Sequence, residues 1–399
     1  MSSPPRATFL DRAAFALLCL FVFSIPWEKS IWVPGVGTLS HLLGILAFAA
    51  FAALLLQRRS LRPPNLAMLW AALFVIWSAA TWLWSYDRPA TVLRIGTFAE
   101  LLAMLWLIWD SCRTAPRQLR LMQAYLCGAV AACGNALLRY LAHQQTYYRR
   151  YAAAGFDPND FGLILALSIP MALYLSLRAR GPLRWCYRAA VLVVLVGLLL
   201  TASRTALIAA FVAFGFALFT WRAADISQRV STVVLFALLV LGLFQLAPVH
   251  SRERLATIPA EIGSGTLHNR TKIWKSGLRA FKHRPVRGVG AGAYPAAVRP
   301  WLGTPGVPGH QYVAHNTFLS VLVECGAVGF GIYALLIGTL VLFIWMMPSA
   351  ERALWSIALL VWAVGVSTLT WEHYKPTWLV FALILTEWAR AFWPAPNQE

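Results

Sequence analysis

The sequence predicts an all-α, polytopic integral membrane protein with about twelve transmembrane helices and one long loop outside the membrane. Three observations support this fold class. The 399-residue chain is 59% hydrophobic, with a mean hydropathy of +0.64. Only 12% of its residues are charged, about half the share expected of a soluble protein. Apolar runs of roughly 20 residues recur, and each is long enough to cross about 30 Å of hydrocarbon.

Hydropathy divides the chain into three parts. Residues 1–248 hold nine predicted spans, residues 249–314 form the long loop, and residues 315–399 hold three further spans. The expected limits of the spans are 13–27, 38–57, 67–86, 92–109, 119–141, 160–177, 186–202, 205–221, 230–248, 315–347, 353–371 and 376–393.

The tenth predicted span begins at the stretch AHNTFLSVLVECGAVG, residues 314–329, and is too long for one straight crossing. Gly326 and Gly329 interrupt its apolar run. We therefore expect either a kink in this helix or a short helix before the span.

Lysine and arginine residues indicate the orientation of the chain. If the N-terminus is cytoplasmic, the predicted inner loops are rich in arginine, whereas the first outer loops hold little more than Lys29 and Arg88. Both termini are therefore expected on the cytoplasmic side. The inner arginines are Arg58, Arg59, Arg62, Arg113, Arg117, Arg120, Arg178, Arg180, Arg184, Arg222, Arg229, Arg352 and Arg390.

Three outer segments break this charge rule. They are the loop around residues 139–160, the short turn TASRT with Arg204, and the long loop. The long loop contains only two glutamates to balance its cations. Outward positive charge runs against the preferred topology, so it indicates an anionic ligand at the outer face. The ten cations of the long loop are Arg252, Arg254, Arg270, Lys272, Lys275, Arg279, Lys282, Arg284, Arg287 and Arg299.

The long loop contains the stretch RTKIWKSGLRAFKH, in which Trp274, Leu278 and Phe281 recur at helical spacing. Lysines and arginines recur at similar spacing on another face. This pattern predicts an amphipathic helix that lies along a membrane surface with a basic side. The Gly-rich stretch that follows, RPVRGVGAGAYP, is expected to be a loop.

His315 and Asn316 stand where the long loop meets the tenth span. A helix N-terminus carries partial positive charge, which disfavours imidazolium and leaves a neutral ring able to act as a general base. The free N–H groups of the same helix end also favour a bound phosphate. The alternative is that this pair only caps a helix at the membrane interface.

Arginines supply the candidate phosphate ligands. Arg204 lies between two apolar runs with almost no loop, where it either binds a phosphate through its guanidinium fork or snorkels to lipid headgroups. Arg270 begins the amphipathic helix and is either a specific contact or one more surface charge. Arg149 and Arg150 are weaker candidates that could equally anchor an interfacial loop. A phosphate-bearing ligand at this face of a membrane protein is most naturally a polyprenyl-linked sugar donor.

Metal, nucleotide and nucleic-acid functions receive no support from the sequence. The eight histidines show no HExxH spacing, the six cysteines show no CxxC spacing, and the outer carboxylates form no DxD pair. The Gly-rich GVGAGAY lacks a βαβ context. Asp157 and Asp160 in GFDPND are expected to form a turn and to cap the sixth span.

The stretch HNTFLSVLVECGAVG fits the signature His-(Asn/Ser/Arg)-nine residues-Gly-two residues-(Gly/Thr/Tyr), with His315, Asn316, Gly326 and Gly329 at the defined positions. With the twelve spans and the long outer loop, this pattern resembles the bacterial O-antigen ligase family, WaaL, of the Wzy_C superfamily. The stretches TASRTALIA and RTKIWKSGLRAFKHRPVRGVGAGAY resemble further features of the family.

The resemblance implies a GT-C-like fold in the bacterial inner membrane with a periplasmic active site. It implies an inverting glycosyltransferase, independent of metal and ATP, that moves O-antigen glycan from undecaprenyl diphosphate to lipid A-core. His315 would be the base that activates the acceptor hydroxyl, and Arg204 and Arg270 would hold the diphosphate. Asn316 would orient the site or cap the helix, and Glu372 is a candidate partner for His315.

Other functions remain open at this stage. O-antigen polymerases and protein O-oligosaccharyltransferases belong to the same superfamily. A transporter of polyprenyl-linked glycans would also suit twelve spans, but it should carry ionisable residues near mid-membrane and paired broken helices in two similar halves. The sequence indicates neither feature, because its charge concentrates at the outer face and its halves differ. The sequence does not specify the glycan, the acceptor sugar or the oligomeric state.

Overall fold

The computed structural model describes residues 8–146, 150–245, 270–302 and 312–392, and it is almost entirely helical in these ranges. Its strands are the short β1 (Trp32–Val33) and β2 (Gly37–Thr38), which pair antiparallel between the first two helices. The elements that form the body are α1 (Phe9–Ser24), η1 (Ile25–Ser30), α2 (Leu39–Arg58), α3 (Leu66–Ala80), η2 (Thr81–Trp84), α4 (Arg88–Ser111), α5 (Ala115–Leu141), α6 (Pro158–Arg178), α7 (Pro182–Thr201), α8 (Arg204–Phe219), α9 (Ile226–Gln245), α14 (Thr317–Met346), α15 (Ser349–Val366) and α16 (Lys375–Phe392).

Every predicted span coincides with a helix of the structure. In the described ranges, nine helices are long and apolar enough to cross a membrane. The other three predicted spans coincide with α8, with α9 and with α16; α8 and the 226–242 stretch of α9 are apolar but shorter. The chain is therefore a helical, multi-pass membrane protein, and the count of twelve stays a prediction.

The helix ends follow from local sequence signals. Asparagine, aspartate, threonine and serine cap seven of the described helix N-termini by accepting a backbone N–H, as in the bond from Met68 N to Asn65 Oδ1 at 3.0 Å at the start of α3. Proline occupies the first turn of α4, α5, α6 and α7, where its missing N–H costs no helical hydrogen bond. Local chemistry thus fixes where these helices begin.

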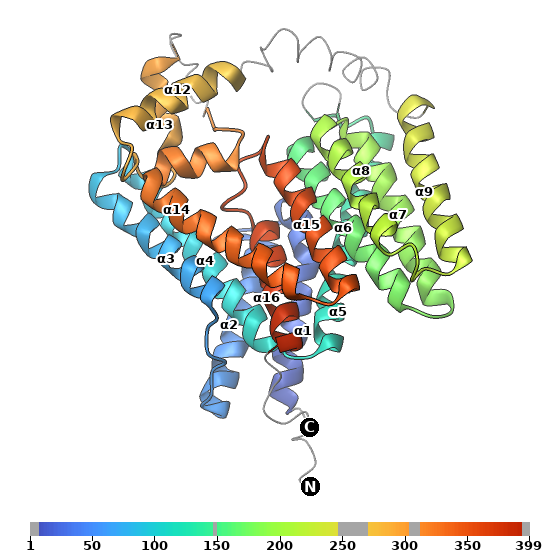
Figure 1. Ribbon diagram of the computed structural model, residues 1–399. Coiled ribbons are helices and arrows are strands. Elements are labelled where there is room, and N and C mark those ends of the chain that lie inside the picture. The colour runs from blue at the N-terminus through green and yellow to red at the C-terminus, as the bar shows by residue number, and fades with distance from the viewer. Residues whose placement is uncertain (1–7, 147–149, 246–269, 303–311, 393–399) are drawn as a thin grey trace.

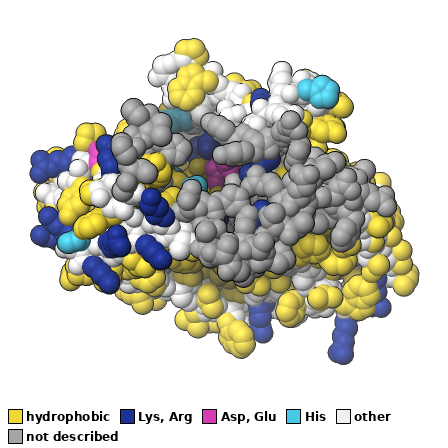
Figure 2. Space-filling view, turned by 90° about the horizontal axis from the view of Figure 1, so that it is seen from above, with side chains coloured by type: hydrophobic (Ala, Val, Ile, Leu, Met, Phe, Trp, Pro, Cys, Tyr) yellow, Lys and Arg dark blue, Asp and Glu magenta, His cyan; other side chains and the backbone are white. Residues whose placement is uncertain are grey.

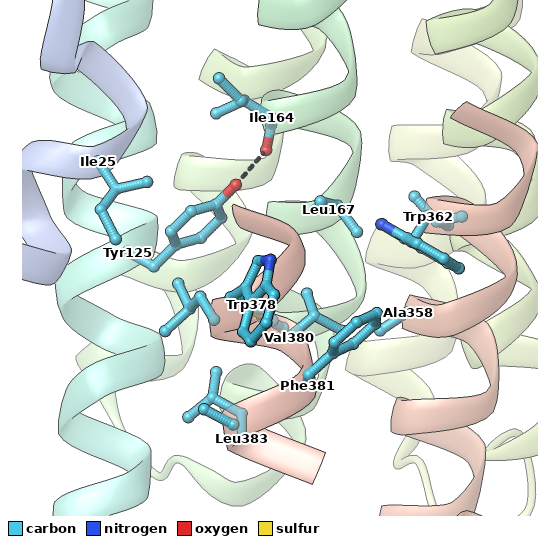
Figure 3. Packing of buried hydrophobic residues seen from close by; sticks show 14 of the residues in the cluster. Ile25, Tyr125, Ile164, Leu167, Ala358, Trp362, Trp378, Val380, Phe381 and Leu383 are labelled. Atoms are coloured by element: carbon cyan, nitrogen blue, oxygen red, sulfur yellow. Dashed lines mark hydrogen bonds between the residues drawn. The ribbon is translucent and has the colours of Figure 1, made fainter. Parts of the chain in front are cut away.

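The core of the bundle lies around α6 and α16. The apolar window of α6 is 89% buried, and residues 376–387 of α16 are all buried, so both helices are surrounded by others. Figure 3 shows part of this core, where Tyr125 of α5 donates to the carbonyl oxygen of Ile164 of α6 at 3.0 Å. Trp362 of α15 packs edge-on against Phe381 of α16 in the same region.

Two short helices cover one end of the bundle. They are α12 (Arg270–His283) and α13 (Tyr294–Val298), followed by the 3-10 turn η5 (Arg299–Trp301). Figure 1 places α12 and α13 at the end opposite the free ends of α1 and α16. The described part of the long loop and the outer ends of α1 and α16 are thus at opposite ends of the bundle, and the side of the membrane that each faces stays a prediction. Residues 246–269 and 303–311 of that loop lie outside the described residues.

The amphipathic helix forms as predicted, and two residues of its predicted apolar face, Trp274 and Phe281, are half-buried. The third, Leu278, is not. The buried side of α12 consists of Ile273, Ser276, Gly277 and Ala280, whereas the side chain of Leu278 is 46% exposed. The cause is Tyr294 of α13, whose hydroxyl donates to the carbonyl oxygen of Ile273 at 3.1 Å. A Cβ at position 277 would lie 2.4 Å from that hydroxyl, so a glycine faces the tyrosine.

Candidate active site at the start of helix 14

The His315–Asn316 pair lies at the first turn of α14. Asn316 is the N-cap residue, and its Oδ1 accepts the backbone N–H of Leu319 at 2.9 Å. His315 has a φ of +47°, a left-handed conformation that is costly for a residue other than glycine. The chain therefore turns sharply at His315 before the helix begins. The capping role expected for Asn316 is present.

The start of α14 is fastened to the connection between α15 and α16. The Nδ2 of Asn316 donates to the carbonyl oxygen of Ser367 at 3.1 Å. The hydroxyl of Thr317 donates to the carbonyl of Leu369 at 3.0 Å and accepts the backbone N–H of Trp371 at 2.7 Å. These three bonds fix the position of His315 relative to the 367–371 segment.

The same segment reaches the helix that carries Arg204. The hydroxyl of Thr368 lies 2.9 Å from the hydroxyl of Thr205, the second residue of α8. Ser203 caps α8 and also donates to Asn159 Oδ1 of α6 at 3.0 Å. Arg204 is thus the first residue of a helix whose N-terminus lies beside the segment that holds Asn316. An arginine at a helix N-terminus is a suitable anion site.

Arg150 has a structural role in the site. Its side chain is buried, and its Nε donates to the carbonyl oxygen of Thr201 at 2.7 Å. Its Nη2 donates to Asn159 Oδ1 at 2.8 Å, so it joins the end of α7 to the start of α6. These bonds are compatible with the anchoring alternative expected from the sequence. Arg149 lies outside the described residues.

Arg270 begins α12 close to His315. Trp274, one turn later, donates its indole N–H to the carbonyl oxygen of Ala314 at 2.8 Å and so fixes α12 next to the residue before His315. The charge of Arg270 acts on the His315 imidazole. The structure therefore brings together two residues that the sequence separates by a long stretch of loop.

The electrostatic surroundings keep His315 neutral. Burial lowers the pKa of its imidazole, and the positive charge of Arg270 lowers it further, whereas the carboxylate of Asp157 raises it. The net pKa lies below the usual value, so the ring is deprotonated near pH 7 and able to accept a proton. Asp157 caps α6 as predicted, through the backbone N–H of Asn159 at 2.7 Å. Its effect on His315 could not be seen in the sequence.

The two signature glycines explain the kink of α14. Gly326 has a φ of +69° and interrupts the helix, as the sequence predicted. The Gly-rich segment enters the break: Val289 N donates to Val323 O at 3.1 Å, and Ala327 N donates to Pro285 O at 2.8 Å. A Cβ at position 326 would lie 2.3 Å from the carbonyl oxygen of Val286. Only glycine fits this approach, and Figure 1 shows the change of direction along α14.

The second glycine admits a neighbouring tryptophan. A Cβ at Gly329 would lie 2.8 Å from the indole of Trp77 on α3. The indole N–H of Trp77 donates to the carbonyl oxygen of Cys325 at 2.8 Å, which the break leaves without a helical partner. The spacing of the signature glycines therefore places a break in α14, and the loop and α3 form hydrogen bonds with the backbone groups at that break.

Glu372 belongs to a buried ionic cluster. Its Oε1 accepts from Arg94 of α4 at 3.0 Å and from the hydroxyl of Ser320 of α14 at 3.1 Å. Arg94 also contacts His373, and Glu372 Oε2 has no hydrogen-bond partner among the described residues. A contact with His315 is not among these interactions, so the expected partnership between Glu372 and His315 has no direct support. Arg94 was missed in the sequence, although an arginine inside an apolar span signals a buried partner.

The face that carries the site is strongly basic. Figure 2 views the molecule from the α12 side and shows lysines and arginines gathered at one end, over α12 and α13. Nearer the middle, acidic, basic and histidine side chains lie together in a hollow. Among the described residues, no cluster of three or more metal-ligating side chains occurs.

Comparison with known families supports the resemblance drawn from the signature. A family model described as O-antigen ligase, Wzy_C, matches residues 189–334. This part of the chain is similar to the Wzy_C family. The matched region includes Arg204, Arg270 and His315, together with both signature glycines. No curated protein matches the chain. The chain is thus a multi-pass membrane protein, and its residues 189–334 are similar to the O-antigen ligase family.

Proposed function

We propose that the chain is an O-antigen ligase that transfers glycan from undecaprenyl diphosphate to lipid A-core. The observation that carries this proposal is the position of His315, a neutral imidazole at the start of α14 beside the guanidinium of Arg270. A base adjacent to fixed positive charge suits transfer of a sugar from a diphosphate leaving group. The Wzy_C match supports the class of reaction.

The proposed reaction is a single displacement. His315 accepts the proton of an acceptor hydroxyl, and the freed oxygen attacks the anomeric carbon of the first glycan residue. The bond from that carbon to the diphosphate oxygen breaks, and its electron pair leaves with undecaprenyl diphosphate. The configuration at the anomeric carbon inverts. Arg204 and Arg270 neutralise the charge that develops on the diphosphate, so the step requires no metal.

Three features of the site are expected to hold the His315 imidazole in position. Asn316 holds the start of α14 through Leu319 and Ser367, so the imidazole keeps one orientation. The left-handed turn at His315 presents its side chain before the helix. The break at Gly326 fastens α14 to the loop that also carries α12. A small displacement of a catalytic base lowers the reaction rate strongly. We therefore expect these contacts to support catalysis by keeping the base in place.

The proposed location follows from charge. We place the protein in the bacterial inner membrane, with both termini cytoplasmic and the site in the periplasm. Arginines near the end of α2 and the start of α5 pair with Asp11 on the side of the free end of α1, as in the bond from Arg58 to Asp11 at 2.5 Å. The cations of α12 lie on the opposite side (Figure 1). This asymmetry supports the orientation.

One assay separates the ligase from its rivals. Purified protein in nanodiscs receives labelled undecaprenyl diphosphate glycan with lipid A-core, with no added acceptor, or with an acceptor protein, each with chelator. The ligase predicts a labelled lipid A-core product that resists chelator. Elongation of the donor alone would indicate a polymerase, and labelled protein an oligosaccharyltransferase; either result would contradict the proposal.

A transporter is the rival from another class. Arg94, Glu100 and Glu324 lie within helices long enough to span a membrane, and a carrier would need such residues. The same protein in sealed liposomes, with donor on one side, tests this function. Movement of labelled donor across the bilayer without transfer to lipid A-core would overturn the ligase proposal.

A further inference from the structure

A groove on the side of α2 and α4 lies apart from the His315 site. Its inner part is a cavity of about 400 Å³ with almost wholly apolar walls, including Phe21, Ile45, Phe48 and Met104. This volume is typical of a small-molecule site. Because α2 and α4 are both candidate membrane spans, the cavity lies where lipid chains would lie.

The apolar cavity continues into a polar one. A second cavity of about 410 Å³ is lined by Glu28, Lys29, Trp32 and His373, among others. The two cavities share His41, Glu100, Leu101 and Lys375. They therefore form one groove. Its apolar part joins its polar mouth at a charged throat, which is formed by the shared residues. An amphiphilic ligand has the same arrangement, with an apolar chain joined to a polar head.

Glu100 places a carboxylate at this throat. It lies midway along α4 (Arg88–Ser111), roughly 18 Å from the start of the helix at 1.5 Å per residue. Its side chain is 54% exposed, and its Oε2 lies 3.8 Å from Nδ1 of His41. The groove around Glu100 is lined by His41 and Lys375, the third residue of α2 and the first residue of α16. Glu100 therefore lies level with the ends of these two helices, where the head group of a lipid would lie.

The charges around the throat fit a ligand that carries both signs. Lys375 donates to Glu28 at 2.5 Å, and Lys29 lies 3.5 Å from the hydroxyl of Tyr374. Each ammonium has three donors, so both retain capacity for a phosphate. The lysines and carboxylates of the lining are Lys29 and Lys375 against Glu28 and Glu100, and their charges sum to zero. A ligand with a large net charge would be left unbalanced in this low-dielectric groove.

We propose that this groove binds a zwitterionic phospholipid with a primary ammonium head, as in phosphatidylethanolamine. The ammonium donates to Glu100, the phosphate accepts from Lys375, and an acyl chain fills the apolar cavity between α2 and α4. The polar mouth touches His373, which contacts Arg94 of the Glu372 cluster. The lipid thus lies beside the ionic cluster that reaches α14 through Ser320.

Lipid chemistry provides the test. Delipidated protein is titrated with phosphatidylethanolamine, phosphatidylcholine and phosphatidylglycerol of identical acyl chains, and with undecaprenyl phosphate, and binding is followed by native mass spectrometry. Phosphatidylcholine has a quaternary ammonium that cannot donate a hydrogen bond, and phosphatidylglycerol has no ammonium. We expect phosphatidylethanolamine to bind about tenfold more tightly than the other three.

Two variants and one control complete the experiment. Glu100→Gln should remove the preference for phosphatidylethanolamine and lower its affinity about tenfold. Ala103→Phe, which fills the apolar cavity, should weaken every lipid equally and tests the chain site if the first variant fails to fold. Asp225→Asn removes a half-exposed carboxylate outside the groove and should bind as wild type.

Three results would overturn the proposal. They are equal binding of the three phospholipids, unchanged binding by a folded Glu100→Gln variant, and preferential binding of phosphatidylglycerol or undecaprenyl phosphate. The last result would assign the groove to an anionic lipid. The readout is binding rather than glycan transfer, so it stands or fails separately from the proposed ligase activity.

Discussion

The side-chain amide of Asn316 donates to the backbone carbonyl of Ser367 at 3.1 Å, while its oxygen caps α14. One residue therefore begins the helix and fastens it to the α15–α16 connection. Asn316→Asp separates the two roles, because aspartate caps helices as well as asparagine but cannot donate to Ser367. We expect kcat for glycan transfer to fall about tenfold, with the melting temperature little changed. Wild-type kcat in this variant would limit Asn316 to capping.

The neutral imidazole predicts a defined response to pH. Transfer requires deprotonated His315, so activity should decline as pH falls through the pKa of the ring, which lies below its usual value. Arg270→Gln removes a charge that lowers this pKa and should move the acidic limb of the kcat/KM profile to higher pH. Asp157→Asn removes a charge that raises it and should move the limb to lower pH.

The control for the pH experiment is Lys272→Gln, an exposed cation on the same helix as Arg270. Its profile should match that of the wild type. Shifts of the same sign for Arg270→Gln and Asp157→Asn would show that neither charge acts on the base as the structure indicates.

Arg204 is expected to hold the donor diphosphate through its guanidinium fork. Arg204→Lys keeps the charge but loses bidentate geometry, and should weaken undecaprenyl diphosphate binding about tenfold; Arg204→Gln should weaken it more. Arg222→Gln, an exposed arginine beyond the other end of α8, is the matched control. Equal binding by Arg204→Gln and wild type in a titration would remove Arg204 from the donor site.

The break in α14 predicts a sharp difference between two glycines of one helix. Gly326→Ala places a Cβ 2.3 Å from Val286 O at a φ of +69°, and should lower the free energy of unfolding by about 2 kcal/mol or more. At Gly331 an added Cβ meets nothing within 4 Å, so Gly331→Ala should be neutral or stabilising by up to about 1 kcal/mol. Thermal melts in detergent check both. Equal melting temperatures for the Gly326→Ala and Gly331→Ala variants would contradict the explanation given for the signature glycine at position 326.

Local sequence signals predicted the positions of the helices but not their contacts. Apolar runs, caps and the glycines of α14 act over a few residues, so the spans, the cap at Asn316 and the kink at Gly326 were predictable. The place of Leu278 on α12 was mistaken because Tyr294, from a later segment, packs against Gly277 on the buried side. Hydrophobic spacing alone favoured Leu278.

Long-range pairs account for what the sequence could not predict in the site. Arg94 and Glu372 are 278 residues apart and meet only through the packing of α4 and α16. Asp157 was read as a cap, which it is, but its action on His315 depends on how α6 and α14 lie together. Electrostatic coupling of this kind requires the three-dimensional arrangement.

The most direct test of the central claim is glycan transfer by His315→Asn. Asparagine tolerates the left-handed backbone at this position, so the variant removes the base without adding strain. His143→Asn is the matched control, because His143 also has a positive φ, +54°, in an exposed loop. In the reconstituted assay with lipid A-core, we predict that His315→Asn loses transfer by a factor of about 100 or more while donor binding persists. Wild-type transfer by a folded His315→Asn protein would contradict the assignment of His315 as the catalytic base.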